Sequence, residues 1–115
     1  MLYENLDVWK RSRALTIQVY KLLENCKDYG FKDQITRSAL SVPSNIAEGC
    51  ERRSIKERIR FFDYAKGSLG EFVTQVDIGA EVGFISKEYS VGLISEGKQL
   101  SKMLYSLMVK LDVNK

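Results

Sequence analysis

The chain has 115 residues, of which 44% are hydrophobic and 29% are charged, and its formal net charge is +3 at pH 7. This length fits one domain over residues 1–115, and the composition is that of a globular protein rather than a disordered one. No apolar run reaches the roughly 18–20 residues that cross a bilayer, so we expect no membrane span.

The chain contains no histidine and only two cysteines. Histidine is the commonest general base and metal ligand, so its absence argues against an enzyme and against a metal site. No glycine-rich phosphate loop is present, and we predict no cofactor. Cys26 and Cys50 form no CxxC motif, and we expect two small buried thiols, with a disulfide as the less favoured alternative. The N-terminal segment lacks the apolar core of a secretory signal, which predicts a cytoplasmic protein.

The first predicted helix is marked by apolar residues at alternating steps of four and three, which lie on one stripe of a helix. The stripe runs from Val8 to Cys26. We expect Asn5 to cap the N-terminus of this helix and Gly30 to act as a left-handed stop after it.

The second predicted helix runs from about Lys32 to Gly49 and contains the only proline of the chain, Pro43. A proline in a helix interior removes the N–H that would bond the carbonyl four residues earlier, at a cost of about 3 kcal/mol. We therefore expect a helix bent at Pro43, with nearby polar side chains that bond one another or the freed carbonyl.

Polar residues form a second stripe on this helix, about 100° around from the apolar stripe. We predict that the stripe lies against "AKGSLGEF" in the third helix, where Gly67 and Gly70 would let two backbones pack closely. In this arrangement, Arg37 pairs with Glu48 or Glu71. The whole predicted polar network comprises Gln34, Arg37, Ser41, Asn45, Glu48, Ser68 and Glu71.

Three interpretations of this network remain open from the sequence. The favoured one is a buried structural network that fixes the register of the helices. A contact between subunits is the second. The third is a ligand or catalytic pocket that holds Asn45, Glu48 and Glu71.

The third predicted helix opens with a capping box from Ser54 to Glu57 and continues toward Gly83, and the fourth starts after Ser86. Four amphipathic stripes with short links and no strand-like alternation predict an all-α protein, an antiparallel up-down-up-down four-helix bundle. The last two helices also carry more apolar surface than a small bundle can cover, which predicts an interface with another subunit. This surface includes Phe61 beside Phe62, Phe72 beside Val73, and Tyr105 with Met108 off the main stripe.

Two groups of basic residues are the candidate nucleic-acid contacts, and the sequence pI is near 8.9. One group surrounds the start of the third helix and the other lies in the first: Arg52, Arg53, Lys56, Arg58 and Arg60, and Lys10, Arg11 and Arg13. We expect the two groups at opposite ends of the bundle, so that only a symmetric ring would repeat each group often enough to hold a polyanion. The alternative is a solvated face interlaced with Glu51 and Glu57.

The motifs "LSVPSNIAEG" and "GSLGE", together with "YENLDVWKRS" and "DQITRSAL", resemble the bacterial four-helix-bundle family named after proteins encoded in intervening sequences of 23S rRNA genes. The resemblance covers nearly the whole chain. The positions that match the family motif are Leu6, Trp9, Gln34, Arg37, Ser41, Asn45, Glu48, Gly49, Gly67, Ser68, Leu69 and Glu71.

The resemblance implies a small helical protomer without enzymatic activity and, from related members, a homopentameric barrel. It also implies a role with nucleic acid, because a relative that accompanies the reverse transcriptase of diversity-generating retroelements binds RNA and protein. We therefore predict a homo-oligomer, by resemblance a pentamer, that binds RNA or a nucleic-acid-processing protein. A protein-interaction scaffold without RNA binding is the alternative.

Overall fold

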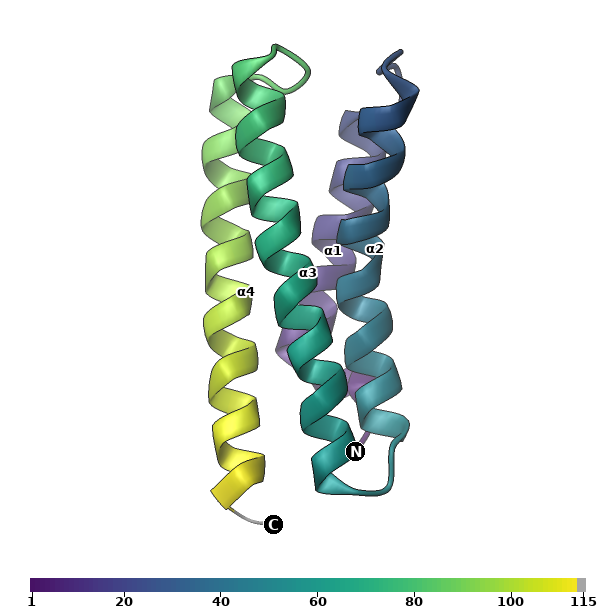
Figure 1. Cartoon of the computed structure of the whole chain (residues 1–115), viewed down its shortest axis with the longest axis vertical. Helices are drawn as coiled ribbons and strands as arrows, with labels where there is room; N and C mark the ends of the chain where they lie inside the picture. Colours follow the sequence, from purple (N-terminus) through teal and green to yellow (C-terminus); the bar gives the residue numbers. More distant parts are fainter. Residues whose placement is uncertain (114–115) are drawn as a thin grey trace.

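The structure is a computed structural model that describes residues 1–113, and over that part of the chain it consists of one short 3-10 helix and four α-helices. Figure 1 shows consecutive α-helices running in opposite directions, and the molecule measures 46 × 20 × 20 Å. The helices are η1 (Tyr3–Asn5), α1 (Asp7–Leu22), α2 (Tyr29–Glu51), α3 (Ile55–Glu81) and α4 (Lys87–Val113). The predicted all-α four-helix bundle is confirmed; of the domain predicted over residues 1–115, positions 114 and 115 lie outside the described part.

The core is a column of apolar side chains along the axis of the bundle. Its largest members, Phe62 and Phe72, come from α3 and are completely buried. The other three helices contribute Val19, Ile46 and Leu100, which are at most 1% exposed. The helix α3 packs along both α2 and α4, whereas α1 and α4 meet over a shorter stretch. Within residues 1–113, no helix combines the length and the apolar character that crossing a membrane requires.

The connection between α1 and α2 differs from the sequence prediction. The residue that caps the start of α2 is Asp28, whose side-chain oxygen accepts a hydrogen bond from the Phe31 N–H at 3.0 Å. Gly30 therefore lies inside α2 and does not act as a stop, because the aspartate cap starts the new helix two residues earlier. Asn5 is also not a cap, since it lies in η1 and α1 begins at Asp7.

The starts of α3 and α4 follow the sequence prediction more closely. Ser54 caps α3, and its hydroxyl oxygen accepts the Glu57 N–H at 3.1 Å. Ser86 precedes α4 and accepts the Tyr89 N–H at 3.2 Å. Between the two helices, Gly83 has a φ of +89°, a conformation that glycine adopts without steric cost.

Pro43 is buried inside α2, which continues through it to Glu51. The carbonyl that Pro43 leaves without its helical partner belongs to Ala39. The hydroxyl of Thr16 in α1 lies 2.9 Å from this Ala39 oxygen and 2.8 Å from the Ser12 oxygen in its own helix. The group that reaches the freed carbonyl thus comes from α1, a source that the sequence analysis did not consider. The bend at Pro43 stays a prediction.

Candidate nucleic-acid interface

Three members of the predicted polar network meet at the seam between α2 and α3. The hydroxyl oxygens of Ser41 and Ser68 are 2.8 Å apart. The Asn45 amide nitrogen lies 2.8 Å from both the carbonyl and the hydroxyl oxygen of Ser41. All three side chains are half-buried. This cluster joins the two helices in one register, as the structural interpretation of the motif predicted.

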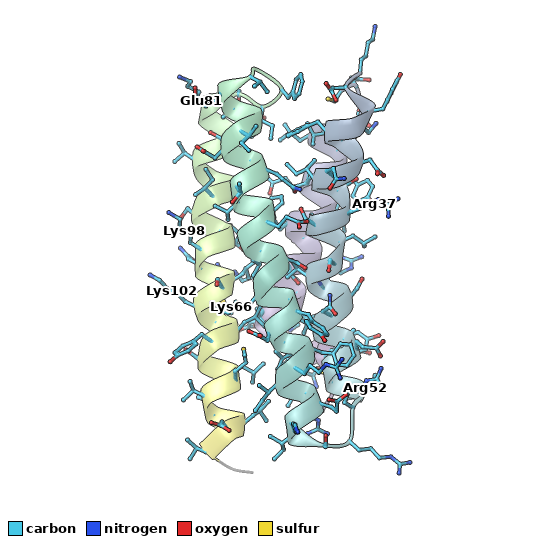
Figure 2. All side chains as sticks on the ribbon, in the orientation of Figure 1. Arg37, Arg52, Lys66, Glu81, Lys98 and Lys102 are labelled. Carbon is cyan, nitrogen blue, oxygen red and sulfur yellow. The ribbon has the colours of Figure 1, made fainter. Side chains whose placement is uncertain are left out.

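The remaining four members of the predicted network point outward. The prediction of one network that includes all of these residues is therefore wrong. Arg37 pairs with Asp33 of its own helix at 3.0 Å, and Figure 2 shows its side chain directed away from α3. Glu48 pairs with Arg52 at 3.2 Å instead of with Arg37. Gln34 and Glu71 are exposed, and within residues 1–113 neither side chain makes a hydrogen bond.

The pocket considered for Asn45, Glu48 and Glu71 is not formed either, because both carboxylates face solvent. Helical spacing explains the outcome. Positions that follow one another along a broad polar stripe cover more of the helix circumference than one neighbouring helix can contact.

Close packing of helices occurs at other glycines than Gly67 and Gly70, and the prediction for these two is wrong. Both are exposed, and a Cβ atom added to either would find no neighbouring atom within 4 Å. The close approaches are at Gly49, Gly79 and Gly97, where an added Cβ would lie 2.8, 2.6 and 2.7 Å from a side chain of a neighbouring segment.

The basic group at the turn between α2 and α3 is largely occupied by local contacts. The Arg52 guanidinium lies 4.7 Å from the centre of the Phe61 ring and pairs with Glu48. Arg58 donates to the Arg52 carbonyl at 2.8 Å, and Arg60 donates to the Tyr64 hydroxyl at 2.7 Å. Arg53 and Lys56 are exposed without a partner in the described part of the chain.

Arg60 holds its charge firmly, because the Tyr64 hydroxyl and then Glu57 raise its pKa above the ordinary arginine value. Glu57 lies 3.4 Å from the Arg60 guanidinium. The predicted alternative of a solvated face interlaced with acidic residues therefore describes part of this group.

The basic group of α1 is divided in the same way. Arg11 reaches α4, where its Nε donates to Glu96 at 2.9 Å and its Nη2 donates to Gln99 at 2.7 Å. The hydrogen bond to Glu96 raises the pKa of Arg11. Lys10 and Arg13 are exposed and, among the described residues, unpaired.

The two basic groups lie at the same end of the bundle, so the prediction of opposite ends is wrong. Figure 1 shows the N-terminus beside the turn between α2 and α3. The Met1 sulfur lies 3.5 Å from the Cys50 sulfur near the end of α2. In an up-down-up-down bundle, the start of the first helix and the second connection necessarily share an end.

Most of the apolar residues predicted to face another subunit are covered within the protomer. Phe62 and Phe72 belong to the core, and Val73 and Met108 pack against it. Phe61 is half-buried beneath Arg52. Only Tyr105 of this set is exposed, at 60%.

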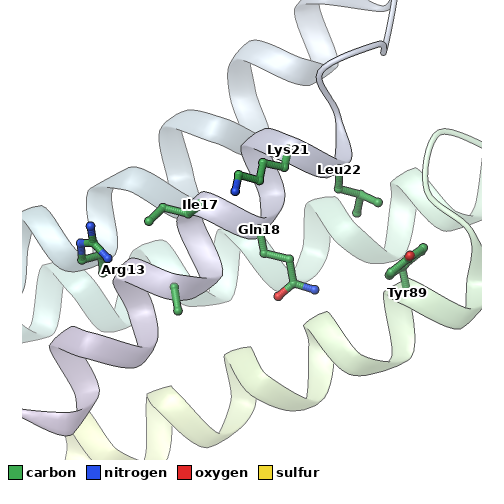
Figure 3. Close-up of a pocket in the computed structure, with 7 residues that line it drawn as sticks. Arg13, Ile17, Gln18, Lys21, Leu22 and Tyr89 are labelled. Atoms are coloured by element: carbon green, nitrogen blue, oxygen red, sulfur yellow. The ribbon is translucent and has the colours of Figure 1, made fainter.

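Exposed apolar side chains gather instead near an open groove between α1 and the start of α4, drawn in Figure 3. The groove has a volume of about 690 Å³, and Ile17, Leu22 and Tyr89 line it together with Arg13 and Lys21. The helices α1 and α4 meet over a shorter stretch than α3 and α4 do, which leaves this side of α1 less covered.

Three basic residues that the sequence analysis did not select come together on the other side of the molecule. Lys66 of α3 and Lys98 and Lys102 of α4 line hollows along the seam between these helices. The sequence carried one signal for this group: Lys98 and Lys102 are four positions apart, and this spacing places two side chains on the same face of a helix. The approach of Lys66 depends on which face of α3 meets α4.

The cysteines and the acidic residues offer no metal site within residues 1–113. Cys50 is buried and Cys26 is half-buried, and both thiols are free. The expectation of free thiols therefore holds for both cysteines, and the expectation of a buried side chain holds for Cys50 but not for Cys26.

Comparison with known proteins adds a family and a fold. The protein-family model described as 23S rRNA-intervening sequence protein matches residues 4–106. The crystal structure of a protein of unknown function from the S23 ribosomal protein family of Bacteroides thetaiotaomicron has a TM-score of 0.83 with this chain. The two are 23% identical, with 88% of this chain and 97% of that chain covered, and this likeness shows the fold alone. No curated protein matches the sequence.

Proposed function

Because the chain belongs to the family of 23S rRNA-intervening sequence proteins, we propose that it is a non-enzymatic, homo-oligomeric helical bundle that binds RNA in the cytoplasm. The family name connects these proteins with ribosomal RNA genes, and the chain carries a net charge of +3. Binding, rather than catalysis, is the activity that this surface supports.

The observation that carries the RNA proposal is a set of exposed cations that no carboxylate of the described residues neutralises. They come from the first half of α1 and from the region where α2 turns into α3, and they are Lys10, Arg13, Arg53 and Lys56. The start of α1 and this turn share one end of the bundle (Figure 1). Unpaired lysine and arginine side chains attract phosphates and release the counterions condensed on RNA. Because both basic groups share one end, a protomer presents them together.

Assembly multiplies this modest charge. In a ring of five protomers, the cations would recur five times, and binding to one protomer would raise the effective concentration of the RNA at the next. We propose the pentamer on the resemblance to related family members. Light scattering is expected to give a mass about five times the 13.2 kDa of the protomer, and a monomer at micromolar concentration would overturn the assembly proposal.

Fluorescence anisotropy with a labelled single-stranded RNA of about 20 nucleotides tests the binding. We expect binding at 50 mM salt that weakens steeply by 200 mM, because each phosphate contact contributes about −0.7 to the slope of log K against log salt for single strands. Absence of binding at 50 mM salt would overturn the RNA proposal.

A protein-interaction scaffold is the second candidate function, and the apolar groove beside α1 favours it. Ile17 and Tyr89, which line this groove, are 38% and 54% exposed. A partner held there would bind mainly through apolar contacts, whose strength changes little with salt. A salt-independent complex with a cellular protein, and no RNA binding, would favour this function over the first.

A further inference from the structure

A groove follows the seam between α3 and α4 on the side of the molecule that Figure 2 shows in front. It consists of two hollows of about 420 and 240 Å³ that share Lys66 and Ser101. One hollow is completed by Lys102, Tyr105 and Ser106, and the other by Leu69, Gly70, Val73, Gly97 and Lys98. The shared residues place the two hollows next to each other along the seam.

The charge of this groove is positive and unpaired. Lys98 and Lys102 lie one turn apart on α4, about 6 Å along the helix axis, and Figure 2 shows their side chains extending outward from this helix. Lys66 of α3 lines one hollow with Lys98 and the other with Lys102. In the described part of the chain, none of the three ammonium groups makes a hydrogen bond or an ion pair. Asp63, one turn before Lys66, does not pair with it. Three neighbouring cations repel one another, so a bound polyanion would stabilise them.

Part of the groove is lined by a glycine, Gly70, which has no side chain to fill it. Gly70 lines the groove, and Gly67 lies one turn away on the exposed surface of α3. Two glycines in a helix interior cost about 1 kcal/mol each relative to alanine. Within the protomer no close contact explains either of them, since an added Cβ atom would touch nothing. An open path for a ligand beside Lys66 accounts for the absent side chain at Gly70.

We propose that this groove binds the phosphodiester backbone of single-stranded RNA, an inference that rests on the proposed RNA-binding function. The three lysines contact successive phosphates, and the hydroxyls of Ser101 and Ser106 donate hydrogen bonds to phosphate oxygens. Tyr105, at 60% exposure, is a surface on which an unpaired base stacks. A duplex keeps its bases stacked inside and leaves this ring unused.

The test compares three charge variants in the anisotropy assay. The groove variant is Lys66→Gln, Lys98→Gln and Lys102→Gln. Its matched control replaces three other exposed lysines that the structure leaves unpaired, with Lys21→Gln, Lys27→Gln and Lys87→Gln. A third variant, Arg53→Gln with Lys56→Gln, removes the free cations of the turn between α2 and α3.

We expect the groove variant to lower RNA affinity at 100 mM salt by at least 30-fold and to reduce the salt slope by about 2, at about 0.7 per lost contact. The control should lower affinity less than threefold. Replacing the same three lysines with arginine should restore the salt slope, which excludes loss of folding as the cause. Tyr105→Leu should weaken single-strand binding about fivefold without changing the slope.

The outcomes separate this inference from the proposed function. Failure of the unaltered protein to bind RNA at low salt would overturn both. RNA binding that the groove variant retains with an unchanged slope would overturn the groove assignment and leave the RNA-binding function standing. Equal affinity for single-stranded and duplex RNA, with no effect of Tyr105→Leu, would overturn the assignment of a single strand.

Discussion

The two seams that α3 forms with its neighbours are built in opposite ways. At the seam with α2, Ser41 and Ser68 hydrogen-bond each other across the interface, and Gly49 lets the Phe62 ring pack against the α2 backbone. At the seam with α4, Lys66 and Gly70 line an open groove whose cations have no partner among the described residues. The polar groups at the seam with α2 therefore bond one another, whereas the cations at the seam with α4 remain available to a ligand.

The same short motif contributes to both seams. In "AKGSLGE", Ser68 and Gly70 are two residues apart, which places them about 200° apart around α3. Ser68 therefore faces α2 while Gly70 borders α4. Residues that are neighbours in a motif do not share a role when the motif is helical, and the partner helix on each side decides what each residue does.

The largest expected effect distinguishes Gly49 at the seam with α2 from Gly70 in the open groove by the same substitution. Gly49→Ala should destabilise the protein by about 2 kcal/mol, because its Cβ would lie 2.8 Å from the buried Phe62 ring and 3.2 Å from the Arg58 carbonyl oxygen. Gly70→Ala should stabilise it by about 1 kcal/mol through helix propensity alone. Thermal unfolding measures both changes, and shifts of the same sign would remove the distinction between a closed and an open seam.

The closed seam also requires α2 to continue as a helix through Pro43. The Thr16 hydroxyl, which bonds the Ala39 carbonyl that Pro43 leaves without a partner, provides the test. Thr16→Val should destabilise by about 1–2 kcal/mol, because the Ala39 oxygen is left without a donor. In a Pro43→Ala background, the restored N–H can bond that oxygen, so the cost of Thr16→Val should fall by about half. A double-mutant cycle from urea unfolding gives this coupling, and strict additivity would contradict it.

The smallest effect concerns a thiol at the lower end of α2. Burial raises the pKa of the Cys50 thiol, whereas Cys26 is half-buried in the first connection. The Cys50 thiol ionises more easily in the unfolded chain than in the folded one. The free energy of unfolding should therefore fall as the pH rises above about 8.5. With a thiol reagent at pH 8, Cys26 should react first and Cys50 only as the protein opens. Equal rates in Cys26→Ser and Cys50→Ser variants would show that this end of α2 is not tightly packed.

Hydrophobic periodicity was sufficient to predict the fold, because four stripes of apolar residues need one another to be buried. Local signals such as Ser54 and Glu57 also identified the start of α3. The same kind of signal failed at Asn5, because α1 begins after Leu6 without a side-chain cap, and at Gly30, because the Asp28 cap starts α2 earlier. Local chemistry therefore predicts the existence of a helix better than its first residue.

The site was less predictable, because its residues are assembled from separate helices. The basic run "ERRSIKERIR" was conspicuous in the sequence, yet closeness in sequence lets Arg52, Arg58 and Arg60 find partners within the same turn. Lys66 lies more than 30 positions from Lys98, and only the pairing of α3 with α4 brings them to one groove. Thr16 was missed for the same reason, since its role depends on which carbonyl of α2 faces α1.

Photo-crosslinking tests the location of the RNA most directly, because each basic region has an exposed tyrosine beside it. Tyr105 lies in the groove between α3 and α4, and Tyr64 lies beside Arg60 near the turn between α2 and α3, with 60% and 45% exposure. A single-stranded RNA containing 4-thiouridine, crosslinked at low salt and mapped by mass spectrometry, is predicted to attach to the α4 peptide that contains Tyr105. Attachment at Tyr64 or Phe61 with none at Tyr105 would contradict the groove assignment and place the RNA at the turn, beside the free cations Arg53 and Lys56.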